Sequence, residues 1–228
     1  TCSIINVIES TIARNSDWVL PIHAGPEIGV ASTKAFLGQL IVLYILCLKL
    51  ASVRGDINKK NYSKNIENLT KLPDAIKNTL KLENDIQIMA KEFINARGTM
   101  FLGRGSSFPI ALEGALKLKE LSYLHAEGYP AGEMKHGPLA LIEEGLPVIV
   151  IAPKDRYYEK TLSNMQEVIS RGGKIFLLTD NKKEALSENI RFGLRVPHLD
   201  DLLSGILFTV PLQLLAYHVA LLKNCDID

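Results

Sequence analysis

Short apolar runs alternate with segments of helical periodicity after about residue 91. The runs are continuous rather than alternating in polarity, which is typical of strands buried on both faces of a parallel sheet. The predicted strands are TMFLGRG, LPVIVIAP, KIFLLTD and FGLRVP. The predicted helices are IQIMAKEFINAR, SSFPIALEGALKLKELSYL, KTLSNMQEVISRG and the long apolar LLSGILFTVPLQLLAYHVALLKN. Strands that alternate with helices indicate an α/β fold in which helices flank a parallel sheet.

The first part of the chain repeats this pattern in a shorter form. Residues 2–9 (CSIINVIE) and 17–25 (DWVLPIHAG) are predicted strands, and a long apolar helix follows them. Ser32 or Thr33 is expected to cap the start of this helix, and Gly55 is expected to end it. We interpret this segment as the end of a first α/β copy that precedes a nearly complete second copy.

The most apolar stretch of the chain, residues 36–53, lies within that long helix. Gln39 and Lys49 interrupt it, so that residues 40–48 are its longest uninterrupted part, whereas roughly 20 apolar residues are needed to span a bilayer. We therefore expect a buried helix, with Cys47 as a buried thiol, and no membrane as a partner. Nothing resembles a signal peptide, and a chain that begins with Thr1 is expected to be part of a longer protein.

A polar segment rich in asparagine and lysine separates the two copies. Its leucines and isoleucines recur every three or four residues, which predicts a helical connector rather than a flexible linker. Pro73 is expected to open a new helix within it. The predicted organisation is residues 1–55 for the end of the first copy, 56–90 for the helical connector, and 91–228 for the second copy.

Composition narrows the class of protein. Hydrophobic residues make up 47% of the chain and charged residues 22%, which is typical of a globular domain. The 26 basic residues nearly balance the 25 acidic ones, and no basic block is interleaved with aromatics, so no nucleic acid is expected as a partner. The three cysteines lack CxxC spacing, which argues against a disulfide framework or a zinc site and fits the cytoplasm.

The first candidate for chemistry is the loop GRGSSFP, which follows the strand TMFLGRG. Ligands of open α/β sheets bind beyond the carboxyl ends of the strands. Gly103 and Gly105 permit tight backbone geometry there, and Ser106 or Ser107 could cap the next helix and offer N–H groups to an anion. An ordinary strand-to-helix turn with a serine cap explains the same residues. The dinucleotide-binding fingerprint is absent, because GRGSSF lacks its third glycine.

The helix after that loop carries a charged stripe. Glu113, Lys117 and Glu120 are spaced i, i+4 and i+7, which places them on one face of the helix. A solvated ion pair would explain this stripe, with the core contacts made by Ile110, Ala111, Leu112, Leu116 and Leu118. The alternative is an acid–base site, because a long Gly/Pro-rich loop with His125 and His136 follows, and imidazole titrates near neutral pH.

A second candidate binding segment is EIGVASTKAF, before the long apolar helix. Gly29, Ala31 and Ser32 are small enough to let a ligand approach closely, and Ser32 and Thr33 supply hydroxyl groups. A helix cap combined with tight helix packing would explain the same residues.

Three longer motifs occur together and in a fixed order. EIGVASTKAF, FLGRG..FPIALEGALKLKELSYLHAEGYPAGEMKHGPLALIE and TVPLQLLAYHVALLK resemble the isomerase half of the glutamine–fructose-6-phosphate aminotransferases, a branch of the SIS (sugar isomerase) family. The resemblance covers nearly the whole chain. It implies a flavodoxin-like SIS domain in residues 91–228, the C-terminal remnant of another SIS subdomain in residues 1–55, and a homodimer.

The resemblance also implies a reaction and its residues. The family makes glucosamine 6-phosphate from fructose 6-phosphate and glutamine-derived ammonia, for amino sugar biosynthesis, with no cofactor and no metal. Glu120 would move the proton between C1 and C2, and Lys117 would stabilise the developing enediol oxygen. His136 would open the fructose ring in the neighbouring subunit, while the Val30 backbone and the Ser32 side chain would contact the sugar.

Parts that the family needs are not in this sequence. The glutaminase domain, the phosphate loop of the first SIS subdomain, and a tail lysine that forms a Schiff base are expected in the same full-length chain. The fragment by itself is therefore expected to be inactive. The alternative is a phosphosugar-binding SIS module of a regulator, which would not need the combination of Glu120, Lys117 and His136.

Overall fold

The computed structural model describes residues 1–185 and 188–228. By its internal contacts the chain divides into two compact units. The N-terminal unit covers residues 1–71, and the C-terminal unit covers residues 72–227. Each unit is described by itself.

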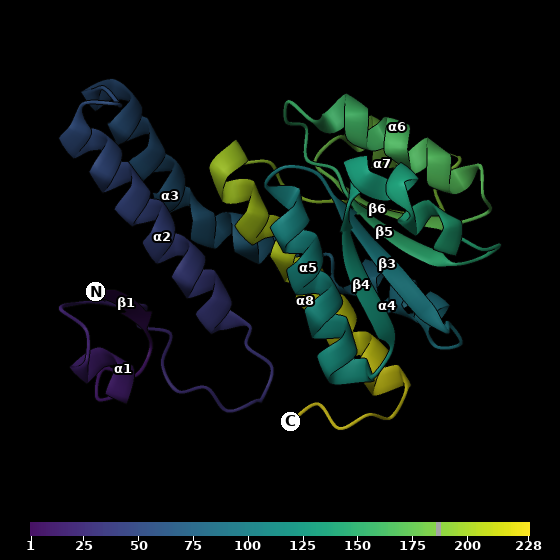
Figure 1. Cartoon of the computed structure of the whole chain (residues 1–228), viewed down its shortest axis with the longest axis horizontal. Helices are drawn as coiled ribbons and strands as arrows, with labels where there is room; N and C mark the ends of the chain where they lie inside the picture. The colour runs from purple at the N-terminus through teal and green to yellow at the C-terminus, as the bar shows by residue number, and fades with distance from the viewer. Residues whose placement is uncertain (186–187) are drawn as a thin grey trace. The chain divides into compact units, whose positions relative to one another are not determined.

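The C-terminal unit contains a five-stranded sheet in which every neighbouring pair of strands is parallel (Figure 1). The strand order is β4-β3-β5-β6-β7. The strands are β3 (Gly98–Gly103), β4 (His125–Pro130), β5 (Pro147–Ile151), β6 (Lys174–Thr179) and β7 (Phe192–Arg195). The predicted α/β fold with a parallel sheet flanked by helices is confirmed.

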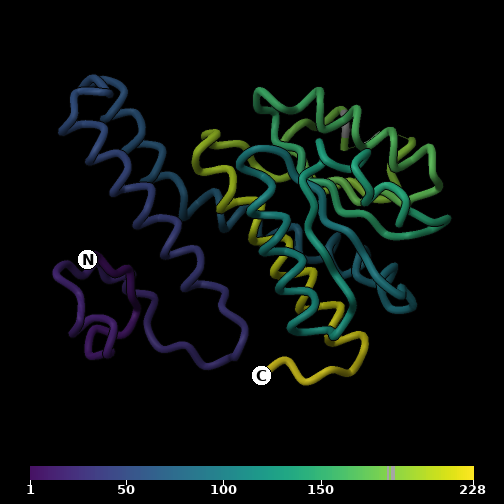
Figure 2. Tube along the Cα trace, in the orientation of Figure 1, coloured from purple at the N-terminus to yellow at the C-terminus, as the bar shows by residue number. Residues whose placement is uncertain are grey.

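Helices and short 3₁₀ turns precede, connect and follow these strands. They are α4 (Glu83–Ala90), η1 (Lys91–Phe93), α5 (Ser107–Ser122), η2 (Ala131–His136), η3 (Pro138–Leu141), α6 (Tyr158–Ile169), α7 (Lys182–Ala185) and α8 (Asp201–Leu222). The chain trace shows α5 and α8 side by side, although they are far apart in the sequence (Figure 2). Asp200 caps α8, because its side chain accepts a hydrogen bond from the Leu202 N–H.

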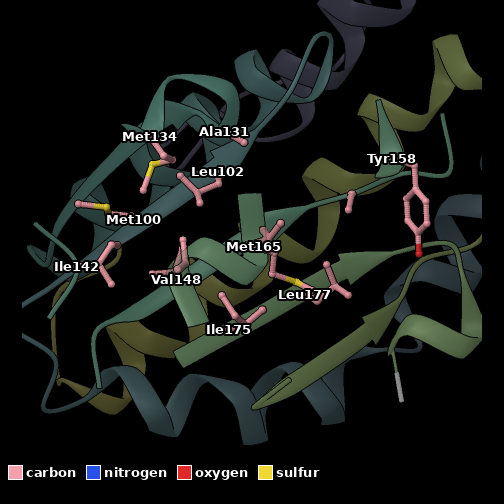
Figure 3. Close-up of a cluster of buried hydrophobic side chains, with 13 residues drawn as sticks. Met100, Leu102, Ala131, Met134, Ile142, Val148, Tyr158, Met165, Ile175 and Leu177 are labelled. Carbon is pink, nitrogen blue, oxygen red and sulfur yellow. The ribbon is translucent and has the colours of Figure 1, made fainter. Parts of the chain in front are cut away.

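Both faces of the sheet are buried, which is why its strands are apolar at consecutive positions. One face carries Met100, Leu102 and Val148, which pack with residues of η2 and α6 in a single hydrophobic cluster (Figure 3). The other face carries Phe101, whose ring lies against Gly114 of α5. Helix α5 and turn η2 therefore cover opposite faces of the same sheet.

The N-terminal unit has β1 (Cys2–Ile5) paired in parallel with β2 (Trp18–Pro21), with the short α1 (Thr11–Arg14) between them. Helix α2 (Lys34–Arg54) follows, and α3 (Lys59–Leu80) runs across the boundary between the two units. The predicted helix ends are confirmed, because Thr33 occupies the N-cap of α2 and Gly55 its left-handed C-cap. The predicted boundaries at residues 55 and 90 stay a prediction.

The interpretation of the long apolar helix as buried is wrong for the described structure. Few residues of α2 are buried, and Cys47 is exposed rather than enclosed. Two helices, α2 and α8, are long and apolar enough to cross a membrane by length and composition alone. This is weak evidence for a membrane span, because the apolar core helix of a globular domain meets the same test, as the largely buried α8 does.

Two local predictions are also wrong. Pro73 does not open a helix but lies inside α3, which continues through it without the one hydrogen bond that a proline cannot donate. The segment before His136 is not a continuous loop, because residues 125–130 form strand β4 beside β3. As an edge strand, β4 needs no continuous apolar run, and its polar sequence gave no strand signal.

We predict that Gly103→Ala destabilises the C-terminal unit. A Cβ atom at Gly103 would lie 2.2 Å from the carbonyl oxygen of Ser107, so α5 would have to move away from β3. The free energy of unfolding, measured by urea denaturation, should fall by about 1–3 kcal/mol. Gly98→Ala at the other end of β3 is the matched control, since its Cβ would meet its nearest atom at 3.4 Å. Equal losses for both variants would contradict the prediction.

Candidate active site

Two N–H groups of the loop that leads from β3 into α5 are already bonded within the turn. The N–H groups of Ser107 and Phe108 already donate to the carbonyls of Arg104 and Gly105, at 3.1 and 3.2 Å. Gly105 has φ +57°, as a tight turn requires, and a Cβ there would overlap the ring of Tyr157. Ser106 occupies the N-cap of α5 without a side-chain capping hydrogen bond, so the serine cap of an ordinary turn is not formed and anion binding by this loop stays a prediction.

The ammonium group of Lys117 lies inside the protein. Its side chain is only 4% exposed, and its Nζ atom lies 2.5 Å from Oε2 of Glu120, one turn further along α5. The Glu120 side chain is 40% exposed. The pair therefore joins a buried cation to a carboxylate that reaches solvent. A substrate could approach Glu120 while Lys117 remains shielded from water.

Glu113 lies one turn before Lys117 and is the third member of the stripe. Its side chain is 11% exposed, and its Oε1 atom lies 3.8 Å from Lys117 Nζ. That oxygen is buried and accepts no hydrogen bond from the described residues. Burial raises the pKa of the Glu113 carboxyl, and the neighbouring Lys117 opposes this shift without cancelling it.

The stripe is thus not the solvated ion pair that its spacing also allowed. The structure buries Lys117 and leaves Leu112 and Leu116 exposed, which reverses part of the predicted core face. Ile110, Ala111 and Leu118 are buried as predicted. Sequence spacing identified which side chains share a face of α5, and tertiary packing decided which face is covered.

His136 lies at the end of η2, and its side chain is 75% exposed. The nearest carboxylate is that of Glu133, whose Oε2 lies 3.7 Å from Nε2. Among the described residues, no hydrogen bond or ion pair joins His136 to Lys117 or Glu120. The structure therefore brings Lys117 and Glu120 together and leaves His136 facing solvent.

Val30 and Ser32 belong to the N-terminal unit, in the irregular segment before α2. Val30 is exposed and Ser32 is half-buried. Within the part of the chain that the structure describes, no group of three or more histidine, cysteine, aspartate or glutamate side chains is arranged to hold a metal ion.

These features define a parallel α/β domain with a candidate acid–base site. A model of the SIS domain family matches residues 92–223. This is more than half of the chain, and the chain therefore belongs to the SIS domain family.

Similar proteins make the resemblance more specific. The chain is 50% identical, over its whole length, to a glutamine–fructose-6-phosphate aminotransferase (isomerizing) of Bartonella henselae. It is 51% identical to the Bradyrhizobium diazoefficiens protein of the same name. It spans 38% of the length of each of these curated relatives.

Solved structures agree in fold. The C-terminal domain of a glucosamine-fructose-6-phosphate aminotransferase from Francisella tularensis superimposes with a TM-score of 0.96 at 44% identity. The match covers the whole of this chain and 64% of that one. A structure from Silicibacter pomeroyi, named a putative phosphosugar isomerase, superimposes with a TM-score of 0.82 at 25% identity.

One residue of the site was left out of the catalytic set predicted from the sequence. Glu113 was recognised as part of the charged stripe but received no role. Its position four residues before Lys117 was the available signal, because side chains at i and i+4 meet on a helix. Its burial could not be read from spacing.

We predict that the Glu113 carboxylate makes stability fall as pH rises. Between the ordinary pKa of a glutamate and the raised pKa of Glu113, the folded chain binds more protons than the unfolded chain. The free energy of unfolding should therefore decrease through this window and remain lower at neutral pH. Glu113→Gln should remove this decline. In urea denaturation, the free energy of unfolding of the variant should therefore rise relative to that of the wild type from pH 4.5 to 7. If the free energy of unfolding of the variant fell relative to that of the wild type over that range, the prediction would be contradicted.

Proposed function

We propose that the chain is the isomerase part of a glutamine–fructose-6-phosphate aminotransferase, which converts fructose 6-phosphate and glutamine-derived ammonia to glucosamine 6-phosphate. The observation that carries the proposal is the buried Lys117 ammonium paired at 2.5 Å with the partly exposed Glu120 carboxylate. The pair lies on a helix of an SIS domain, and relatives that carry this activity in their names are about half identical to the chain.

Ketose–aldose isomerisation needs one base that removes a proton from C1 and returns it to C2. Glu120 is suited to this task because its carboxylate is held in place by Lys117 and remains accessible. Negative charge develops on the sugar oxygen as the proton leaves. The Lys117 ammonium, shielded from water, would stabilise that charge more strongly than a solvated cation could.

His136 would open the furanose ring as a separate acid–base group. Helix α5 and turn η2 cover opposite faces of one sheet, which supports a role for His136 in a second subunit rather than beside its own Glu120. The enzyme would then be a homodimer with shared sites. The Val30 backbone and the Ser32 hydroxyl would contact the sugar.

The relatives are much longer than this chain, since the match spans 38% of their length. We propose that a glutaminase domain supplies ammonia within the same full-length protein, in the cytoplasm, and that the fragment alone does not complete the reaction. A regulatory SIS module would bind a sugar phosphate without turnover, so activity measurements separate it from the enzyme.

We predict that Glu120→Gln in the full-length protein lowers the rate of fructose 6-phosphate conversion by about 10²–10⁴-fold, the range that a general acid–base group contributes. Glutamine hydrolysis should remain measurable, because it would take place in another domain. Glucosamine 6-phosphate and glutamate, the products of the two reactions, are quantified by chromatography at saturating substrate concentrations.

Glu143→Gln is the matched control, since this carboxylate is exposed outside α5 and should leave the rate unchanged. Unchanged synthesis by the Glu120 variant would remove Glu120 from the mechanism. Sugar phosphate binding without any turnover by the wild type would favour the regulatory module.

A second prediction concerns the shared site. If His136 acts in the neighbouring subunit, heterodimers of Glu120→Gln and His136→Ala chains contain one site in which both residues are intact. Mixed dimers, purified with two different affinity tags, should recover up to roughly half of the wild-type rate by this count of intact sites. Verified heterodimers with no recovered activity would instead assign both residues to a site within one chain.

A further inference from the structure

The turn that carries His136 is fixed on its inner side. Ala131 and Met134 of η2 are fully buried in the hydrophobic cluster that covers one face of the sheet, which also contains Met165 of α6 (Figure 3). His136 lies two residues after Met134 and points its side chain outward. Burial of these two apolar residues holds the turn against the sheet. The position of its exposed, polar side depends on other contacts.

Two polar contacts tie η2 and its surroundings to α6, and we call their four residues the α6 anchor: Arg104, Lys135, Asn164 and Glu167. Lys135 Nζ lies 3.1 Å from Glu167 Oε1. Arg104 donates from a guanidinium nitrogen to the Asn164 side-chain oxygen at 3.1 Å. Asn164 and Glu167 are three residues apart and therefore share one face of α6.

Arg104 also touches η2 directly. A Cβ atom on Gly132 would lie 2.8 Å from the Arg104 guanidinium, so the glycine lets this group rest on the backbone of the turn. The α6 anchor thus holds η2 near both of its ends, through Gly132 and through Lys135. The residue that follows Lys135 is His136.

The ion pair of the anchor differs from an ordinary surface pair, which contributes little to stability. Glu167 is only 20% exposed, and its Oε2 atom is buried without a hydrogen bond from the described residues. A carboxylate in this position requires a compensating charge, and Lys135 is the cation in contact with it. Lys135 itself is 67% exposed, so the pair joins a solvated ammonium to a largely buried carboxylate and limits how far Lys135 can move away from α6.

His136 has no comparable fixed partner of its own. Its ring lies 3.7 Å from the largely exposed Glu133 carboxylate, and Gly137 follows with φ +141°, a conformation that side chains rarely adopt. The position from which the imidazole projects therefore depends on the backbone between Lys135, which is paired with α6, and the turn at Gly137.

We propose that Glu167, through its ion pair with Lys135, is a positioning residue that aims His136 at the sugar ring for ring opening. The inference rests on the proposed function and adds the structural element that sets the geometry of its first step. Glu167 touches no substrate, so its loss should impair ring opening and spare the later proton transfer by Glu120.

The test uses two substrates and the full-length protein. Fructose 6-phosphate is mostly a closed ring, whereas 5-deoxyfructose 6-phosphate lacks the C5 hydroxyl and stays open. Glu167→Gln and Lys135→Met should each lower kcat on fructose 6-phosphate by roughly 10- to 100-fold, the scale expected for a displaced catalytic group. Neither should change kcat on the open-chain analogue, and the double variant should lose no more than either single one.

Two variants make the outcomes distinguishable. Glu159→Gln, an exposed carboxylate on the same helix, should match the wild type on both substrates. His136→Ala should show the same substrate-selective loss as Glu167→Gln, only larger. Equal losses of His136→Ala on both substrates would overturn its ring-opening role, and the inference with it. A selective loss for His136→Ala with no selective loss for Glu167→Gln or Lys135→Met would overturn the positioning role alone.

Discussion

The burial of one ammonium group organises the candidate active site. An isolated charge in a protein interior is strongly unfavourable, so Lys117 must be paired wherever α5 carries it. The same helix supplies the compensating negative charge, because Glu113 lies one turn before Lys117 and Glu120 one turn after it. The two carboxylates are not equivalent. Glu113 is enclosed and has a raised pKa, whereas Glu120 contacts the cation closely and reaches solvent. Environment thus gives the two carboxylates different roles.

The sheet lies between the two elements that carry the candidate site residues of the C-terminal unit, α5 with Lys117 and Glu120 and η2 with His136. Helix α5 packs on the face that carries Phe101, and η2 packs with α6 on the face that carries Leu102 (Figure 3). Successive residues of a strand point to opposite faces, so neighbours in β3 support different elements of the candidate site. This arrangement holds each element on a rigid surface.

Much of the fold could be predicted because its signals are local. The continuous apolar runs of β3, β5 and β6 and the lengths of α5 and α8 were evident in the sequence, and the structure confirms them. Strand β4 was missed because HAEGYP is an edge strand with few apolar side chains. The exposure of α2 and the position of Pro73 inside α3 were missed for a related reason, since composition does not say what covers a helix or whether it tolerates a proline.

The sequence by itself determined which residue types lie together on a helix face, since the 3.6-residue period places Glu113, Lys117 and Glu120 in one row. It also carried the motifs that relate the chain to the SIS family. Only the tertiary structure decided that Glu113 and Lys117 are buried while Glu120 reaches solvent, and that Glu167 and Lys135 meet although they are far apart in the chain. The physical reason is that burial and long-range pairing depend on which elements pack against each other, and helical periodicity holds no information about the partner surface.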